Sequence, residues 1–403
     1  MEFDDEKQKN EHDLDENLAT NFIAYDDQLS KTATSMDRLS NLPDCILHHI
    51  LSYMNATYCV RTSVLSKRWN RVWASLPVIK FEGLYFNPRP TRRREYFRDL
   101  VLGFLNGRDH HAPINYLGLD LSGAYDLDSH EYDLDENFAT NFLAYVDSHD
   151  IQHLAMVFSP SHKKMPAEAF PKTLFPCQLQ SVKTLDLKYY DHHCPSNLEL
   201  SPSPAAQTLT TLRLHHCGFW GGNSLDPFAS FVNLKELYLH SCRFDHLGIT
   251  FKITAPQLVR LDINLFKHVC MRWGFDDSLK LEIWAPKLQS FRCYLNCPIH
   301  LSSLHLPVLE NLEIKFMHAS SMSHYTYFKS LEFLMNMFEG FHHAQSVKIC
   351  ANTIVLLRLA KPAALERRPF PFTRLKTLTI MDRDDNIPAN VMAYFLRTAL
   401  WHQ

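Results

Sequence analysis

The sequence predicts an α/β fold, with a short helical bundle followed by an irregular solenoid whose strands form a curved parallel sheet. Two patterns carry this prediction. Apolar residues recur at helical spacing in residues 36–82, and a leucine phrase recurs many times farther on. The chain has 403 residues, of which 46% are hydrophobic and 21% charged, an ordinary globular composition. That length suffices for one long solenoid or for two to three compact domains.

The first 82 residues divide into a polar extension and a helical segment. Residues 1–35 are polar and acidic, which predicts a disordered or loosely helical extension. Pro43 then stands where a first helical turn tolerates proline, and Asn55 and Thr57 supply a turn and a cap for a second helix. One apolar face holds Leu42, Ile46, Ile50 and Leu51, and another begins with Val60, Val64 and Leu65. Residues 36–82 are therefore expected to form a bundle of about three short helices.

A basic stretch with two prolines follows, and we assign residues 83–113 to a linker and an entry helix. It contains Arg89, Arg92, Arg93 and Arg94. A run of charge of this kind usually forms a solvated linker. The alternative is a patch that binds phosphate or a partner protein.

A leucine phrase defines the body of the chain. Leu209, Leu212, Leu214 and Cys217 recur at the same spacing as Leu234, Leu237, Leu239 and Cys242, and the phrase returns at Leu258, Leu261 and Ile263. Successive copies begin 25 residues apart (234 − 209) and then 24 residues apart (258 − 234). Repeats of this length are typical of leucine-rich repeats, so residues 114–360 are predicted to form the solenoid. Looser copies bring the total to ten: Ile114/Leu117/Leu119, Ile151/Leu154/Met156, Val182/Leu185/Leu187, Leu288/Phe291/Cys293, Leu309/Leu312/Ile314, Ala344/Val347/Ile349 and Leu375/Leu378/Ile380.

Each repeat is expected to contribute one short strand to a shared sheet. Alternate side chains of the phrase point inward, and one strand cannot bury its apolar face alone, so neighbouring repeats stack. The ninth position, occupied by Cys217 or Cys242, is expected to pack inside the turn and bond the backbone. Ala255-Pro256 and Ala285-Pro286 each precede a strand, where proline ends the previous segment without removing a ladder bond.

One segment is duplicated outside the repeat pattern. Residues 11–25 match residues 131–145 except at 12/132, 18/138 and 23/143. The second copy predicts an amphipathic helix with Leu134, Phe138, Phe142 and Tyr145 on one face, leading into a strand at Ile151–Met156. The first copy has no strand to lead into. It is interpreted as a segment duplication or a mis-joined gene model, and alternatively as a helix that competes for its twin's docking site.

Two stretches carry a resemblance to a known family. Leu42-Pro43-Asp44, Leu47 and Ile50-Leu51-Ser52 precede Val60-Arg61-Thr62-Ser63-Val64-Leu65-Ser66-Lys67-Arg68-Trp69 and Trp73. Together they resemble the F-box of plant F-box/LRR-repeat proteins. The body resembles the leucine-rich and FBD-containing members through the repeat phrase and Ala285-Pro286-Lys287-Leu288-Gln289-Ser290-Phe291, and residues 361–403 resemble a truncated FBD-like region.

The resemblance implies a non-catalytic adaptor of an SCF-type cullin–RING ubiquitin ligase. In that family the F-box docks on a Skp-type adaptor that links it to cullin and RING subunits, while the body presents a protein substrate and raises its effective concentration near the charged conjugating enzyme. Trp69 matches the aromatic anchor, and Trp73 is expected to close the small core. The residues that match the docking positions are Leu42, Pro43, Ile46, Leu47, Ile50, Leu51, Val60, Ser63, Leu65, Ser66 and Trp69.

Two alternatives to this interpretation stay open. The same apolar residues could form only the core of the bundle, because a unit this short must share them between core and interface. The chain also departs from the family at Met54–Cys59, where a proline and a Lys-Asp pair are replaced, which is expected to loosen that turn. The alternative function is therefore a leucine-rich interaction scaffold that has lost its coupling to the ligase.

Several other function classes are disfavoured. Lys and Arg total 41 against 44 Asp and Glu, for a net charge of −3, whereas general nucleic-acid binding needs a basic excess. The amino terminus is acidic rather than signal-like, and no stretch reaches the roughly 20 apolar residues that span a bilayer. A cytoplasmic or nuclear protein with reduced cysteines is expected.

Metal, enzyme and small-ligand sites receive little support from the motifs. His192-His193-Cys194, His215-His216-Cys217 and His240-Ser241-Cys242 recur because the repeat recurs, so no zinc site is expected. No nucleotide-binding or nucleophile-elbow motif is present, so no cofactor and no catalytic residue are expected. A small-ligand pocket stays an alternative, lined by aromatic residues outside the strand phrases: Phe219, Trp220, Phe266, Trp273 and Phe275.

Overall fold

The computed structural model of the protein divides into two units, residues 1–50 and 51–403, and each is described by itself. It describes residues 39, 41–82, 93–121, 136–158, 179–189, 207–219, 224–244, 250–265, 280–295, 300–316, 324–358, 360, 365, 370–381 and 387–396. The copy at 11–25 and the basic residues Arg89 and Arg92 lie outside these ranges.

The first unit contributes helix α2 (Asp44–Leu51), whose last residue opens the second unit. Pro43 stands directly before the helix. Its carbonyl accepts the first hydrogen bonds of the helix, from the N–H groups of Ile46 (3.0 Å) and Leu47 (3.2 Å). Asp44 places an acidic group in the first turn, where it complements the helix dipole. The expected first helix is therefore present, with its start fixed by Pro43.

The second unit opens with two helices joined by a 3-10 turn. These are α3 (Ala56–Arg61), η1 (Thr62–Val64) and α4 (Lys67–Ala74). Asn55 caps α3 by accepting the N–H of Thr57 at 3.1 Å. The Thr62 hydroxyl donates to the carbonyl of Cys59 at 2.6 Å, which helps to turn the chain at the end of α3. The expected set of three short helices is confirmed.

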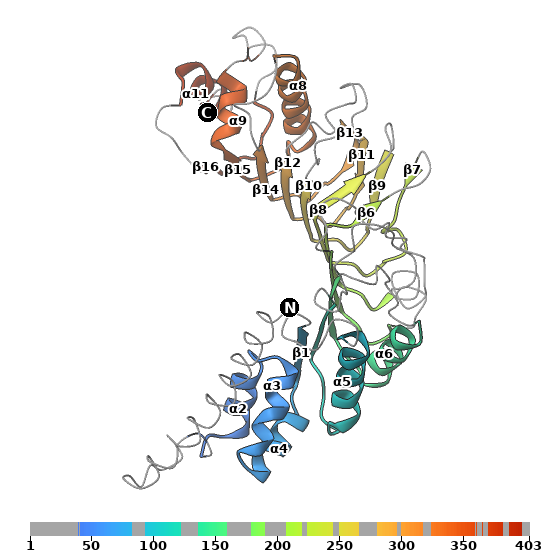
Figure 1. Ribbon diagram of the computed structural model, residues 1–403. Helices are drawn as coiled ribbons and strands as arrows, with labels where there is room; N and C mark the ends of the chain where they lie inside the picture. The colour runs from blue at the N-terminus through green and yellow to red at the C-terminus, as the bar shows by residue number, and fades with distance from the viewer. Residues whose placement is uncertain are drawn as a thin grey trace, which may run out of the picture. The chain divides into compact units, whose positions relative to one another are not determined.

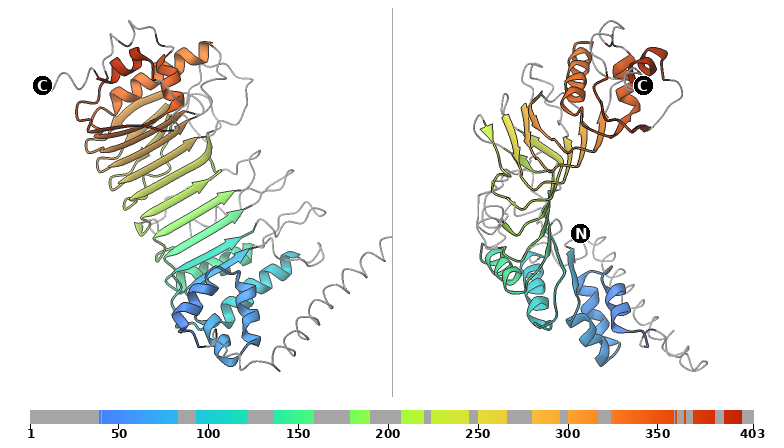
Figure 2. Two further views of the ribbon diagram at one scale, coloured as in Figure 1. Left: turned by 90° about the vertical axis from the view of Figure 1, so that its left-hand side faces the viewer. Right: turned by 180° about the vertical axis from the view of Figure 1, so that it is seen from behind.

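A long parallel sheet forms the rest of the second unit (Figures 1 and 2). Among the described residues it has 12 strands, and β6 pairs beside β8, off the main order. Figure 1 shows this sheet bending along its length, as the sequence predicts. In spatial order the strands are β1 (Val78–Glu82), β2 (Tyr116–Asp120), β3 (His153–Phe158), β4 (Thr184–Tyr189), β5 (Thr211–His215), β8 (Glu236–Phe244), β10 (Arg260–Leu265), β12 (Ser290–Leu295), β14 (Asn311–Phe316), β15 (Ser346–Cys350) and β16 (Thr377–Met381).

Each strand of the sheet is one rung of a continuous ladder. Leu212 aligns with Leu237, and Leu237 with Leu261, so the first inward leucines of the phrase stack directly. All ten units read from the sequence fall on strands β2 to β16, and their inward residues are buried as far as β15. An eleventh rung was not recognised. Strand β1 carries Ile79 and Phe81 at the same spacing after Leu76, so the sheet begins before residue 114, and β16 extends it beyond 360.

The ninth position of the phrase behaves as expected from the sequence. Cys242 is buried, and its Sγ lies 3.5 Å from the Leu214 carbonyl of the preceding rung. Cys217 is also buried and contacts the carbonyl of His215 at 3.7 Å. The residue before each cysteine adopts a left-handed backbone, with φ of 57° at His216 and 54° at Ser241. That conformation turns the chain so that the sulfur enters the core.

A second, smaller sheet was not expected from the sequence. Its strands are β7 (Ser224–Leu225), β9 (Thr250–Thr254), β11 (Lys280–Trp284) and β13 (His300–His305), and neighbouring strands pair in parallel. The Ala-Pro pairs, which are predicted to precede a strand and end the previous segment, connect β9 to β10 and β11 to β12. Each repeat in this region therefore contributes a strand to both sheets. Strand β6 (Gly218–Phe219) adds a short pairing with β8.

The described residues of the second unit also form five further helices. They are α5 (Arg93–Gly107), α6 (Glu136–Ser148), α8 (His324–Gly340), α9 (Ala351–Arg358) and α11 (Ala389–Leu396). Phe138 and Phe142 of α6 are buried, and Tyr145 is half-buried with its ring stacked on His149. The amphipathic helix expected for residues 131–145 is thus confirmed over its described part, and Leu134 lies outside it.

Helix α5 packs against both α4 and β1, the first strand of the sheet. Phe104 of α5 lies 5.2 Å from the ring of Trp73 and 5.3 Å from that of Phe81. The buried Arg108 donates to the carbonyls of Leu76 (3.1 Å) and Ala112 (3.1 Å), so its charge meets backbone oxygens. Trp73 therefore closes a core, as expected, and that core is shared with the sheet.

Candidate functional site

The candidate docking residues of the first unit all lie on or beside α2. Leu47 is fully buried, Leu42 is half-buried, and Pro43 is exposed. Ile46 and Ile50 are 43% and 39% exposed. They stand four positions apart and so share one stripe of the helix. The helix thus presents an apolar stripe, while Leu47 serves the interior.

The candidate residues of the second unit separate in the same way. Leu51 and Trp69 are buried, while Val60, Ser63 and Ser66 are half-buried. Leu65 is 63% exposed. Its neighbour Val64, which was not among the predicted docking residues, is 86% exposed. Val64 ends η1 and Leu65 caps it, so the sequence signal that could have identified Val64 was its place beside Leu65 on the same predicted apolar face.

Burial divides the predicted docking residues into core residues and exposed residues. Leu47 in the first unit and Leu51 and Trp69 in the second unit are buried in the free chain, which agrees with the alternative that these positions serve the core. Ile46, Ile50 and Leu65 are exposed apolar side chains, and a helical surface of this kind suits burial in a partner's groove. The predicted docking set therefore contains both kinds of residue.

The turn at Met54–Cys59 is firmly bonded despite its departure from the family pattern. Asn55 is buried, and besides capping α3 its Nδ2 donates to the carbonyl of Glu82 on β1 at 3.1 Å. The buried Cys59 Sγ lies 3.5 Å from the Leu51 carbonyl, and burial raises the pKa of Cys59 to about 12. These contacts argue against the expected loosening, because they replace the missing proline with side-chain bonds.

A second candidate surface is the open face of the large sheet, on which the outward side chains of the strands lie. In the left view of Figure 2 the middle strands run side by side with no described helix in front of them. The register places a middle row of six outward residues across six neighbouring strands: Asp186, Arg213, Tyr238, Asp262, Arg292 and Glu313. Opposite charges are adjacent along most of this row, which favours cross-strand pairing.

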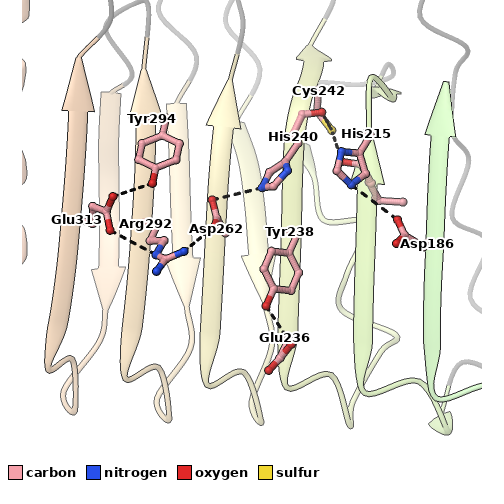
Figure 3. Close-up of polar contacts among 11 residues, drawn as sticks. Asp186, His215, Glu236, Tyr238, His240, Cys242, Asp262, Arg292, Tyr294 and Glu313 are labelled. Carbon is pink, nitrogen blue, oxygen red and sulfur yellow. Dashed lines mark hydrogen bonds and ion pairs between the residues drawn. The ribbon is translucent and has the colours of Figure 1, made fainter. Parts of the chain in front are cut away.

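Asp262 lies at the centre of a chain of polar contacts on the open face (Figure 3). It is only 5% exposed, with His240 Nε2 at 3.4 Å and Arg292 Nη1 at 3.8 Å. Arg292 continues to Glu313 at 3.4 Å. Tyr294 donates its hydroxyl to the same Glu313 at 2.7 Å, and burial followed by this bond raises the pKa of Tyr294. The network fixes these side chains before any partner binds.

Tyr238 and its neighbours form a second cluster on the open face. Its hydroxyl donates to Glu236 at 3.0 Å, and burial is the main reason that the pKa of Tyr238 is raised. The guanidinium carbons of Arg213 and Arg260 lie 4.9 Å and 5.9 Å from the ring centroid. Tyrosine and arginine are the side chains that most often dominate protein interfaces.

His215 on the open face is held in its neutral form. His215 lies 3.7 Å from Asp186, and its ring lies 4.9 Å from that of His240. Burial, followed by the charges of His240, Lys188 and Arg213, lowers the pKa of His215 to about 4. The raised pKa of Asp186, also caused by burial, weakens the one contact that would favour a charged His215. The face therefore suits binding by shape, hydrogen bonds and aromatic contact.

The described residues offer no cluster of three side chains that could hold a metal ion. His192-His193-Cys194 lies outside them, and Cys217 and Cys242 are bonded to backbone carbonyls. Of the small-ligand candidates, Phe219 is buried against Phe228 and Phe251 at 6.0 Å and 5.4 Å, so it is a core residue. The other four are not among the described residues. None of the described helices is long and apolar enough to cross a membrane.

Comparison with known protein families identifies the helical segment. Residues 39–81 match the F-box domain. The chain carries an F-box. The docking candidates on and around α2, α3, η1 and α4 fall inside this domain. The domain match ends in β1, which is also the first strand of the large sheet.

The relatives of this F-box chain combine the same two parts. It is 23% identical over 356 residues to a putative F-box/LRR-repeat protein of Arabidopsis thaliana, covering 86% of this chain and 66% of that protein. It is 26% identical over 262 residues to F-box/LRR-repeat protein 25 of the same plant, covering 64% and 86%. A putative F-box/FBD/LRR-repeat protein is 29% identical over 230 residues, covering 57% and 50%. The chain thus spans between half and most of the length of these relatives.

Proposed function

We propose that this chain is the substrate-recognition subunit of an SCF-type cullin–RING ubiquitin ligase. In this proposal its F-box docks on a Skp-type adaptor, which links it to the cullin and RING subunits, and the sheet binds a protein substrate. The F-box at 39–81 is the observation that carries the proposal. F-box/LRR-repeat proteins are in general non-catalytic adaptors, and the same role is proposed for this chain in the cytoplasm, the nucleus or both.

The exposed apolar side chains support the docking step. Ile46, Ile50 and Leu65 offer hydrocarbon to a groove without first unfolding the F-box, and Val64 adds to them. Burying a fully exposed aliphatic side chain contributes about 1.5–3 kcal/mol. Ile46 and Ile50 are already more than half covered, so each can contribute only a fraction of this value on docking, and Leu65 and Val64 can contribute more.

The open face supports the substrate step. Its charges are paired with one another, so attraction at long range contributes little, while Tyr238, Arg213 and Tyr294 present flat surfaces with fixed hydrogen-bonding groups. Interfaces gain affinity from a few such anchors rather than from area alone. The face therefore fits a folded or extended protein segment better than a polyanion.

The experiment is a pull-down of a purified Skp-type adaptor by the full chain and by two matched variants. Leu65→Glu and Ile46→Glu place a charge on exposed positions and are expected to reduce adaptor retention at least about tenfold while the melting temperature stays unchanged. Val232→Glu, at an exposed position just before β8, is the control and should bind normally.

Buried positions make poor tests of docking. Alanine at Leu47 or Trp69 would damage the core, so a loss of binding there would not report on docking. Retention of the adaptor by the Leu65→Glu variant at the level of the unchanged chain contradicts the proposal. Failure of the unchanged chain to bind the adaptor favours the alternative, a leucine-rich scaffold without ligase coupling.

A further inference from the structure

The F-box helices of the second unit carry an excess of positive charge. Residues 51–81 contain five lysines and arginines and no aspartate or glutamate, a formal charge of +5 in a chain whose net charge is −3. Like charges gathered in so short a segment repel one another, and a surface of one sign attracts a partner of the opposite sign. The five cations are Arg61, Lys67, Arg68, Arg71 and Lys80.

Three of these cations are exposed and form no ion pair in the part of the chain that the structure describes. Arg61 ends α3, Lys67 begins α4, and Arg71 stands four positions after Lys67 on the same stripe of that helix. None of the three takes part in the ion pairs of the described residues. The guanidinium carbon of Arg61 lies 5.4 Å from the ring centroid of Tyr58, so its neighbour is a ring and not a carboxylate.

Exposed apolar side chains lie between these cations along the chain. Val64, at the end of η1, is 86% exposed, and Leu65, which follows it, is 63% exposed. Protein interfaces combine an apolar centre that excludes water with a polar rim in the same way. We call the exposed side chains of Arg61, Val64, Leu65, Lys67 and Arg71 the α3–α4 surface.

Lys67 stands where its charge costs folding stability. It is the first residue of α4, where the helix dipole repels a cation. The first turn of α4 contains no acidic residue, and the side chain of the N-cap residue Ser66 makes no capping hydrogen bond. Arg71 adds a like charge four positions later. Proteins break such local rules mainly at sites that serve function.

We propose that the α3–α4 surface docks on an acidic surface of the Skp-type adaptor, and that its cations steer the two proteins together. This deepens the proposed function and rests on it, because it names the charge that the adaptor presents. Carboxylates of the adaptor surround an apolar recess that takes Val64 and Leu65. Charges at the rim of an interface raise the association rate, whereas the buried centre mainly sets the dissociation rate.

An acidic protein suits the α3–α4 surface better than a nucleic acid. DNA-binding proteins with a strong salt dependence make about 6–10 phosphate contacts, more than three exposed cations provide. The apolar centre consists of a valine and a leucine, whereas single-stranded bases stack on aromatic rings. The surface therefore matches carboxylates placed around hydrocarbon.

The test measures the rates at which the full chain associates with a purified Skp-type adaptor and dissociates from it. The Debye length falls from about 30 Å at about 0.01 M ionic strength to about 8 Å at about 0.15 M. Over this range the association rate is expected to fall at least about tenfold, while the dissociation rate changes by less than about threefold.

Lys67→Glu separates docking from folding, because the two effects have opposite signs. An acid at this position complements the helix dipole and pairs with Arg71, so the melting temperature is expected to rise by about 1–3 °C. The association rate at low ionic strength is expected to fall at least about threefold. Lys235→Glu, at an exposed position just before β8, makes the same change in net charge and should leave the association rate within about 1.5-fold.

Three results overturn the proposal. They are an association rate that does not depend on ionic strength, equal association rates for Lys67→Glu and Lys235→Glu, and binding of a labelled oligonucleotide that Lys67→Glu abolishes. If Lys67→Glu lowers the melting temperature, Lys67→Gln removes the charge without adding another and repeats the comparison. Normal adaptor binding at a salt-independent rate refutes steering without refuting the ligase role, whereas no adaptor binding by the unchanged chain refutes both.

Discussion

At the scale of single residues, His215 shows how the open face sets the charge of its side chains. Burial is the main cause that lowers its pKa to about 4, and the positive charges of His240, Lys188 and Arg213 add to it. Asp186 lies 3.7 Å away but is itself made harder to ionise by burial. The neutral imidazole is therefore part of the folded structure at neutral pH.

This lowered pKa predicts that the protein loses stability as the pH falls from about 6.5 to 4. The unfolded chain, with a histidine pKa near ~6.5, binds the proton in this window while the folded chain resists it. The stabilisation is therefore fully present above pH 6.5 and is lost as the pH falls towards the folded pKa. Urea unfolding of the unchanged chain and of His215→Gln should differ by on the order of 2 kcal/mol in their pH dependence. Parallel pH profiles would show that His215 is freely protonated in the fold.

The docking residues illustrate what a sequence can and cannot specify at this scale. Helical spacing placed Ile46, Leu47, Ile50 and Leu51 correctly on a helix, but it assigned the two isoleucines and Leu51 to one apolar face. The structure buries Leu47 and Leu51 and exposes the two isoleucines. Spacing could not separate them, because a short helix offers an apolar stripe wide enough for both core and partner.

At the scale of elements, the contact between α8 and β13 is unusually close. A Cβ built on Gly340, the last residue of α8, would lie 2.5 Å from Leu304 Cδ1 on β13. Glycine at this position thus lets the helix approach the smaller sheet, although it costs helical stability.

Gly340→Ala is expected to destabilise the chain by about 0.5–1 kcal/mol, because the end of the half-buried Leu304 side chain must turn aside to admit the methyl group. In a Leu304→Ala background the same change should stabilise by up to about 1 kcal/mol, since only the helix propensity of alanine then remains. A double-mutant cycle by chemical denaturation measures the coupling. Identical effects of Gly340→Ala in both backgrounds would show that the two residues do not interact.

The strands show where the leucine phrase predicts the fold correctly and where it does not. The phrase predicted ten strands because each inward pair has the same spacing, and the register stacks those pairs rung on rung. It missed β1, whose Ile79 and Phe81 follow a helical segment rather than another repeat. It also missed the smaller sheet, because strands such as β9 and β11 have no counterpart in the leucine phrase and are recognisable only by their alternating burial.

At the scale of the whole second unit, the parallel sheet is a one-dimensional stack whose two ends are closed differently. At the β1 end, Asn55, Trp73 and Phe104 add hydrogen bonds and aromatic contacts to the first rungs. At the β16 end, Leu378 and Ile380 are half-buried. A stack of this kind opens from its less protected end, because each rung is stabilised mainly by its immediate neighbours.

Hydrogen exchange is therefore expected to be graded along the ladder. Amides of β5, β8 and β10 should exchange most slowly, with opening free energies that approach the global value, while those of β16 should exchange fastest among the strands of the large sheet. The rungs at the β1 end should resemble the middle of the stack, because α5 and Asn55 hold them. Exchange resolved by peptide mass spectrometry measures this order. Equal protection of β16 and β8 would mean that the unit opens as a single cooperative body.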